Sequence, residues 1–372
     1  AYTAGMASEI IGLGNEAVTL DDTTLMAATL NTLDGNTTGA VDATTLMTIT
    51  GSAAHVNTAY TAGMASEIIG LGNEAVTLDD TTLAVTTLNT LDSNTTGTID
   101  ATTVTKLTGS ASDVNSAYAS GGVTNLDGDE AVTLSDTTLS AATLNTLDGN
   151  TTGAVDATTV TTLTGSAANV NTAYESMGIS NLADEAVTLT DTSLAAATLN
   201  MLDGNTTGTI DAATLSTLTG SAANANTAYA SGGVTNLGDV TVILTDTTLT
   251  VATLNTLIGY STGLVDATTV TTLTGSTTDV NTAFTAFAEG KINSLGNEAV
   301  TLTDTAVFAE TVVAIDSATS GAINATNVIA LTGSASNANS ALTSAGLTNF
   351  DGDEAVTLTD TSLAAATLNT LD

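Results

Sequence analysis

The 372-residue chain has no cysteine, no proline and no tryptophan, and it sets one histidine and two lysines against 39 acidic residues. Without cysteine the chain has neither a disulfide framework nor a thiolate metal site. A formal charge of −37 excludes a nucleic-acid binder that depends on phosphate contacts, because those contacts need lysine and arginine. The same deficit excludes a polybasic segment that binds a membrane surface.

Long hydrophobic runs are also missing. No stretch approaches the roughly 20 apolar residues of a membrane span, so we expect no membrane insertion. The first residues, AYTAGMASEI, carry no basic segment of the kind that opens a signal peptide. Hydrophobic residues still make up 42% of the chain, which separates it from acidic disordered tails. Many acids and few lysines suit a salty medium, where charge repulsion is screened, and this indicates an extracellular or cell-surface location.

What the chain does have is one repeat, written six times in full and once in part. The alanine of TAY or its variants recurs at nearly even spacing, at Ala1, Ala59, Ala117, Ala173, Ala228, Ala283 and Ala341. The repeats span residues 1–58, 59–116, 117–172, 173–227, 228–282 and 283–340, followed by a partial repeat at 341–372. Such a period predicts that each unit buries its apolar face against its neighbours. We therefore interpret residues 1–372 as a single continuous repeat array.

Within one repeat the hydrophobic period changes along the chain. Residues 130–137, EAVTLSDT, alternate as a strand does, and residues 152–158, TGAVDAT, predict a second short strand. Residues 140–150 and 166–176 place apolar residues three apart after a serine suited to capping a helix. The order β-α-β-α predicts an α/β fold: a right-handed solenoid of β-α coils, with a parallel sheet on one flank and short helices on the other. An all-β solenoid is the alternative, because threonine and valine favour strands.

Groups suited to catalysis are scarce. His55 is the only histidine, and the matching positions of the other repeats hold aspartate or asparagine. We interpret it as a solvent-facing polar residue. The sequence has no cysteine nucleophile, no phosphate-binding glycine loop and no HExxH motif. We therefore expect a protein that is not an enzyme.

Aspartates recur in three columns, with one residue in most repeats. The first column is Asp22, Asp80, Asp136, Asp191, Asp246, Asp304 and Asp360. The second is Asp42, Asp100, Asp156, Asp211 and Asp266, interrupted by Asn324, and the third is Asp34, Asp92, Asp148, Asp203, Asp316 and Asp372, interrupted by Ile258. Aspartate after a strand caps a turn by accepting backbone N–H groups, whereas a row of carboxylates is also suited to calcium. We favour the capping role and keep calcium as the alternative.

The sharper calcium candidates are the loops NLDGDEA and NFDGDEA. Their carboxylates are Asp127, Asp129 and Glu130 in the first loop and Asp351, Asp353 and Glu354 in the second. Calcium prefers carboxylate and carbonyl oxygens, although neither loop follows the twelve-residue EF-hand pattern. We expect no other cofactor.

Five Asn-X-Thr sequons permit glycan attachment if the cell performs it. They lie at Asn36, Asn94, Asn150, Asn205 and Asn324. Their NTTG context also fits a glycine-containing turn, which is the interpretation we favour.

The segments VTLTDTSLAAATLNTLD and GAVDATTVTTLTGSAANVNTAY resemble a known family. They are similar to the Thr/Ala-rich tandem repeats of very large cell-surface proteins of marine cyanobacteria, which are associated with surface-dependent swimming. More distantly, they resemble repeat regions of large calcium-associated bacterial adhesins. The likeness covers essentially the whole chain, and it implies no catalytic residues. The nonapeptide GGxGxDxUx of the calcium-binding β-roll is missing.

These features predict a non-enzymatic structural protein that builds or extends an extracellular fibre. Open strand edges at the ends of a solenoid favour end-to-end self-association, and head-to-tail contacts that do not close produce filaments. Two alternatives remain. One is a calcium-stabilised adhesin stalk that spaces a binding domain from the cell. The other is an ice-binding solenoid with ranks of threonine, which the aspartates of the second strand argue against.

Overall fold

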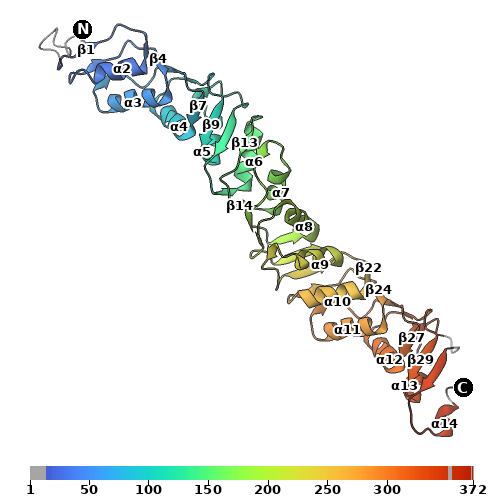
Figure 1. The fold of residues 1–372 in the computed structure, drawn as a ribbon. Coiled ribbons are helices and arrows are strands. Elements are labelled where there is room, and N and C mark those ends of the chain that lie inside the picture. Colours follow the sequence, from blue (N-terminus) through green and yellow to red (C-terminus); the bar gives the residue numbers. More distant parts are fainter. Residues whose placement is uncertain (1–13, 351–353, 370, 372) are drawn as a thin grey trace. The chain divides into compact units, whose positions relative to one another are not determined.

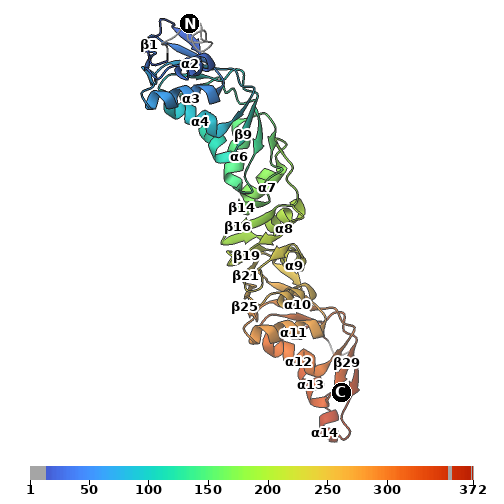
Figure 2. The same cartoon turned by 60° about the vertical axis from the view of Figure 1, so that its left-hand side comes forward.

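We describe the protein from a computed structural model that places residues 14–350, 354–369 and 371. The chain divides into two compact units. Unit 1 comprises Ala1–Gly165 and Asn169–Glu185, and unit 2 comprises Ser166–Ala168 and Ala186–Asp372. Both units are built from strand-helix coils, with short helices on one side and parallel strands on the other (Figures 1 and 2). The α/β prediction is therefore confirmed over its all-β alternative. The prediction of one continuous array concerns how the two units join, and it stays a prediction.

The helices are short and recur twice in each repeat. Those of unit 1 are α2 (Ala27–Asp34), α3 (Ala53–Met64), α4 (Val85–Asn94), α5 (Ala111–Ala119), α6 (Ala141–Asn150) and most of α7 (Ala167–Glu175). Those of unit 2 are α8 (Ala196–Asn205), α9 (Ala222–Ala230), α10 (Val251–Tyr260), α11 (Thr277–Ala288), α12 (Ala309–Ala318), α13 (Ala335–Leu342) and α14 (Ala365–Leu368). Helices of this length are marginal alone in water, so packing between coils must hold them.

The strands are shorter still, and those in the described residues have at most four residues, as in the AVTL segment. Those of unit 1 are β1 (Val18–Thr19), β2 (Thr24–Met26), β3 (Val41–Asp42), β4 (Thr48–Gly51), β5 (Ile68–Ile69), β6 (Ala75–Leu78), β7 (Thr82–Ala84), β8 (Ile99–Asp100), β9 (Lys106–Gly109), β10 (Val123–Thr124), β11 (Ala131–Leu134), β12 (Thr138–Ser140), β13 (Val155–Asp156), β14 (Thr162–Gly165) and β15 (Ile179–Ser180). Those of unit 2 are β16 (Ala186–Leu189), β17 (Ser193–Ala195), β18 (Ile210–Asp211), β19 (Thr217–Gly220), β20 (Val234–Thr235), β21 (Thr241–Leu244), β22 (Thr248–Thr250), β23 (Val265–Asp266), β24 (Thr272–Gly275), β25 (Ile292–Asn293), β26 (Ala299–Leu302), β27 (Ala306–Phe308), β28 (Ile323–Asn324), β29 (Ala330–Gly333), β30 (Leu347–Thr348) and β31 (Ala355–Leu358).

Parallel pairing joins strands of successive coils rather than neighbours in sequence. Unit 1 contains the sheets β1-β3-β5, β10-β8-β6-β4-β2 and β15-β13-β11-β9-β7 and the pair β12-β14. Unit 2 contains the run β16-β18-β20 and the sheets β17-β19-β21-β23-β25, β22-β24-β26-β28-β30 and β27-β29-β31. Each coil therefore adds strands to two sheets that lie next to each other along the chain.

The length of the repeat explains why the sheets change. Thr24 pairs with Thr48, and Thr48 pairs with Ala75, so two coils extend from Thr24 to Ala75. The sequence itself returns to the position of Thr24 only at Thr82. The repeat is thus longer than its two coils by the segment from Ala75 to Thr82, which carries the chain out of one sheet and begins the next at β7.

The core is a thin layer of valine, leucine and alanine between strands and helices. In one coil Val132 and Leu134 point inward from β11, while Ala141, Leu144 and Leu147 are fully buried on α6. The period of two in the strand and of three in the helix places all five on the same side. Burying a leucine or valine side chain contributes roughly 1.5–3 kcal/mol, so neighbouring coils stabilise each other.

Two details differ from the sequence analysis. Residues 138–140, 162–165 and 179–180 form strands β12, β14 and β15, which we had not predicted. Strands this short hold too few residues for a periodic signal, and pairing with the adjacent coils stabilises them. Ser140 occupies the N-cap position of α6 without a side-chain bond, and other repeats place Ala84 or Phe308 there.

Candidate functional site

The first predicted calcium loop folds around its glutamate. Glu130 is 1% exposed, and its carboxylate accepts N–H bonds from Asp127 (3.0 Å) and Gly128 (3.2 Å). The Tyr118 hydroxyl donates a third bond, with an O–O distance of 2.8 Å. Asp127 and Asp129 are exposed on the same loop. The Glu130 carboxylate therefore points inward while Asp127 and Asp129 lie at the surface, and calcium binding at this loop stays a prediction.

The second predicted loop is only partly described. Asp351 and Asp353 lie outside the described residues, and Glu354 is buried, as Glu130 is. Within the part of the chain that the structure describes, no three or more His, Asp or Glu side chains converge as metal ligands would. Calcium binding at this loop stays a prediction.

A column of buried glutamates is the feature that sequence reasoning missed. Its fully buried members are Glu74, Glu130, Glu185 and Glu298, each 1% exposed. At Glu74 the carboxylate accepts the Gly72 N–H (2.8 Å) and the Tyr60 hydroxyl (3.2 Å). Burial is the main cause that raises the pKa of Tyr60, and the Glu74 carboxylate adds to it. The signal was the glutamate before the AVTL strand, paired with the tyrosine of TAY.

The fifth repeat replaces this arrangement. Val240 stands where the other repeats have glutamate. Tyr229 there donates to the Val240 carbonyl oxygen (3.4 Å) and lies 3.3 Å from the Ser261 hydroxyl. Burial raises the pKa of Tyr229 as well. Ser261 stands where the other repeats have threonine. Val240 and Ser261 together thus keep the Tyr229 hydroxyl bonded.

The first aspartate column caps helices of the preceding coil. The Asp136 carboxylate accepts the first N–H of α5, from Ala111, at 2.8 Å, while Ser110 accepts the Asp113 N–H. An anion at a helix N-terminus is favoured by the helix dipole and by the unpaired N–H groups there. The same bond recurs at Asp80, Asp191, Asp246, Asp304 and Asp360. For these six the prediction that the carboxylate accepts a backbone N–H is confirmed, although the N–H belongs to a helix of the preceding coil and not to the turn that follows the strand.

The second column closes turns and reaches the next coil. The Asp100 carboxylate accepts the Thr102 N–H (3.1 Å), the Thr102 hydroxyl (2.6 Å) and the Asn125 side-chain amide (2.7 Å). These donors, the Thr102 hydroxyl first, lower the pKa of Asp100. Asn125 adopts φ 59°, a left-handed conformation that asparagine tolerates. Asn324 accepts the same set of bonds, so the role does not need a charge.

The third column ties the end of one helix to the loop after the next. Asp92 accepts the Ser120 hydroxyl (2.8 Å), and Ser120 in turn accepts the Gly122 N–H (3.0 Å). The same bond recurs at Asp148, Asp203 and Asp316, whereas Asp372 lies outside the described residues.

Asp34 differs from the rest of the third column. It lies with Glu67 and Thr37 on a pocket of about 340 Å³. Burial raises the pKa of Asp34, and the negative charge of Glu67 raises it further. Two carboxylates of the described residues thus share one pocket here.

An asparagine ladder joins successive helices. The Asn89 amide donates to the Asp113 carbonyl oxygen (3.0 Å), and the Asn115 amide donates to the Thr143 carbonyl oxygen (3.1 Å). The bond recurs at Asn31, Asn57, Asn145, Asn200, Asn226 and Asn255. In α12 the matching residue is Val313, so the ladder is interrupted before α13.

The remaining candidates are also placed in structural roles. His55 is exposed, and its Nδ1 lies 3.1 Å from the Ser52 hydroxyl at the start of α3. The sequon residues Asn94 and Asn150 donate their amides to Asn57 and Asn115. A glycan on either amide would replace one of its two hydrogen atoms. Among the other sequons, Asn36 and Asn205 are half-buried, and Asn324 belongs to the second column.

Two further findings do not concern a single site. None of the helices in the described residues is long and apolar enough to cross a membrane. Comparison with protein-family models and with curated proteins found no match.

Proposed function

We propose that this chain is a non-enzymatic structural repeat protein that builds or extends an extracellular surface fibre. Its coils would stack end to end, and its role would be mechanical. The observation that carries the proposal is the use of side chains: the glutamate, aspartate and asparagine columns bond loops, helix ends and neighbouring coils. The resemblance to cell-surface repeats of marine cyanobacteria points the same way.

The charge supports this mode of assembly. With 39 acidic residues and two lysines, lateral contact between copies brings like charges together. Lys291 is already paired with Glu289 at 2.9 Å. Contact through an exposed strand edge at the end of a stack pairs open backbone groups and buries apolar surface, which offsets the repulsion. End-to-end addition is therefore favoured over lateral clumping.

Electron microscopy and sedimentation velocity of the purified chain test the proposal. We expect linear assemblies that lengthen as protein concentration rises. Leu368→Asp places a charge on the exposed end of unit 2 and should abolish assembly, whereas Thr146→Asp, on an exposed helix surface, should not. A chain that remains monomeric at every concentration would contradict the proposal.

A second candidate is the calcium-stabilised stalk, which one observation favours. Asp34 and Glu67 repel each other across a shared pocket, and a divalent cation would relieve that repulsion. Differential scanning calorimetry with and without calcium separates the candidates. A rise of several degrees in Tm that Asp34→Asn and Glu67→Gln together remove would support calcium binding. An unchanged Tm argues for the fibre without metal.

The register of the sheets argues against ice binding. The outward rows pair Thr133 with Thr108 on one side and with Asp156 on the other. A carboxylate within the threonine row disrupts the uniform hydroxyl spacing that an ice surface requires. We do not propose this function.

A further inference from the structure

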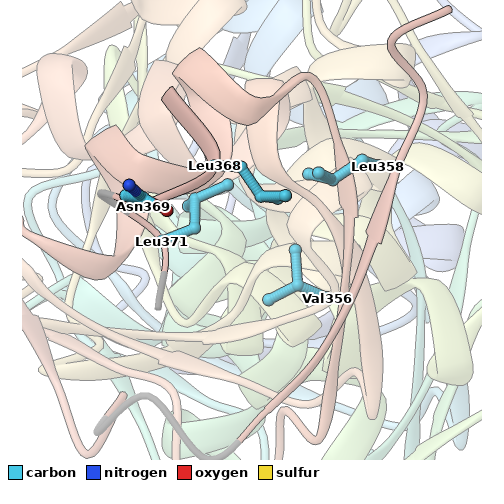
Figure 3. Close-up of a pocket in the computed structure, with 5 residues that line it drawn as sticks. All are labelled: Val356, Leu358, Leu368, Asn369 and Leu371. Atoms are coloured by element: carbon cyan, nitrogen blue, oxygen red, sulfur yellow. The ribbon is translucent and has the colours of Figure 1, made fainter. Parts of the chain in front are cut away.

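Two kinds of feature among the described residues could hold a small molecule. The pocket at β31 and α14 is mainly apolar (Figure 3), and its lining residues are Val356, Leu358, Leu368, Asn369 and Leu371. Buried polar atoms without a protein partner lie elsewhere. Two of them are carboxylate oxygens, Oε1 of Glu74 and Oε1 of Glu298, and both residues are 1% exposed. A buried carboxylate oxygen without a donor is destabilising, so these two atoms point to a ligand.

The two glutamates end the same four-residue sequence, LGNE, at residues 71–74 and 295–298, which we call the LGNE loops. The first repeat carries the same letters at residues 13–16, but Leu13 lies outside the described residues. Glu74 Oε2 accepts the N–H groups of Gly72 (2.8 Å) and Asn73 (3.2 Å), and in the second loop the corresponding distances are 2.7 Å and 3.2 Å. Both backbone donors therefore go to one oxygen, and Oε1 is left without one.

Glu130 shows the alternative arrangement, because it follows Asp-Gly-Asp rather than Leu-Gly-Asn. Its Oε1 accepts the Asp127 N–H (3.0 Å), while its Oε2 accepts the Gly128 N–H (3.2 Å) and the Tyr118 hydroxyl (2.8 Å). The N–H of Leu71, which matches that of Asp127, makes no bond to the Oε1 atom of its loop. An LGNE loop is thus one donor short of the arrangement at Glu130.

The LGNE loops also lie farther from the helix of their own coil. A Cβ at Gly128 would lie 2.8 Å from the carbonyl oxygen of Asn150, the last residue of α6. At Gly296 the corresponding distance, to the carbonyl oxygen of Ala318 at the end of α12, is 3.5 Å. A Cβ at Gly72 would meet no atom within 4 Å. The gap between loop and helix end is therefore wider where Oε1 lacks a donor.

Both sides of this gap carry hydrogen-bond acceptors. The glycine that borders the gap donates its N–H to the glutamate, so the carboxylate lies on one side. On the other side α4 ends at Asn94 and α12 ends at Ala318, and the last carbonyl groups of a helix lack partners within it. Two acceptors match the two O–H groups of one water molecule. A calcium ion takes about six to eight oxygen ligands, and no three His, Asp or Glu side chains of the described residues converge.

We propose that one buried water molecule completes each LGNE loop. It donates one hydrogen bond to the glutamate Oε1 and the other to the carbonyl oxygen at the end of the helix, which is Asn94 for Glu74 and Ala318 for Glu298. The water replaces the N–H that Asp127 supplies at Glu130, and buried water of this kind is part of the structure that it bonds. The inference goes beyond the proposed function and does not depend on fibre formation.

A crystal structure of the unchanged chain, at a resolution that shows ordered water, tests the proposal. We expect one water at about 2.5–3.0 Å from Oε1 of Glu74 and of Glu298. Glu130 Oε1 is the control within the same chain and should have no water. Glu74→Val copies Val240 of the fifth repeat, and it should remove the water at its own loop and leave the one at Glu298.

Several outcomes would overturn the proposal. They are an Oε1 atom without a water, an Oε1 atom in direct contact with the helix-end carbonyl, and a peak with anomalous signal after a soak in rubidium chloride, which would identify a cation. Nuclear Overhauser effects between water and amide protons provide a second measurement in solution. The amides of Gly72 and Gly296 should show contact with long-lived water and that of Gly128 should not, and equal signals at all three would contradict the site.

Discussion

At Glu130 a carboxylate that is 1% exposed is held by two backbone N–H groups and the Tyr118 hydroxyl. Buried charges are stable only when such donors replace water. The chain varies this site by itself: Glu298 is matched with Phe284 in place of tyrosine, and Val240 removes the carboxylate altogether. The repeats therefore differ in the donors that surround this position.

Changing Tyr118 to phenylalanine copies the sixth repeat. The Glu130 carboxylate then loses one donor while its two N–H bonds remain. A hydrogen bond to a charged group contributes about 1.5–3 kcal/mol, so we expect a loss of that order in local stability. Hydrogen exchange at β11 and α5 measures it, with Tyr260→Phe, at an exposed tyrosine, as control. A loss no larger than that of the control would contradict the assignment.

The second aspartate column predicts a pH dependence. The pKa values of Asp100 and Asp156 fall below their ordinary value of 3.8, chiefly because threonine hydroxyls donate to them. A carboxyl whose pKa is lower in the folded chain contributes its full stability above about pH 4. That contribution is lost as the pH falls through the folded pKa.

Asp156→Asn should flatten this dependence, because Asn324 already makes the same bonds without charge. Urea midpoints measured between pH 2 and pH 7 provide the comparison. We expect the variant to lose less stability on acidification than the unchanged chain. Identical slopes would show that the bonds of Asp156 do not depend on its ionisation.

At the scale of the elements, the sequence predicted helices and the AVTL strand well. Residues 166–176 correspond to α7 at 167–175, and residues 130–137 contain β11. The sequence signal of these elements is local, because the serine before a helix and the alternating residues of a strand lie within the element or directly beside it. Strands β12 and β14 gain their stability from pairing with each other, although they belong to successive coils. The bond between Glu130 and Tyr118 likewise joins residues 12 positions apart, so the sequence of the loop alone does not reveal it.

The interrupted asparagine ladder predicts a weak interface between α12 and α13. Val313→Asn restores the side chain that bonds the next helix elsewhere, with the Asn337 carbonyl as its acceptor. We expect about 0.5–1.5 kcal/mol of added stability, which is the net value of one hydrogen bond. Slower hydrogen exchange in α12 and α13 would show it. Val313→Ala serves as control, and unchanged exchange in the asparagine variant would contradict the ladder.

At the scale of the whole molecule, 39 acids and two lysines dominate the interactions between copies. Raising the salt from about 0.1 M to about 1 M shortens the Debye length from about 10 Å to about 3 Å, so repulsion between copies weakens. We expect assemblies in sedimentation velocity to grow with salt, and Leu368→Asp to remove the effect. Assemblies that dissolve at high salt would indicate contacts between opposite charges instead.

Each repeat holds two different coils, one with an AVTL-like strand and one with a VD-like strand, and this has a consequence for how such a chain changes over evolutionary time. Residues 1–25 and 59–83 are the same in sequence, which is the mark of a duplication. A duplication of one coil would place two helices with inward leucines, such as α6, against each other. A duplication of both coils keeps each such helix beside one with small inward residues, such as α7. The number of repeats can therefore rise or fall by whole repeats, and each change in length keeps the packing between neighbouring coils.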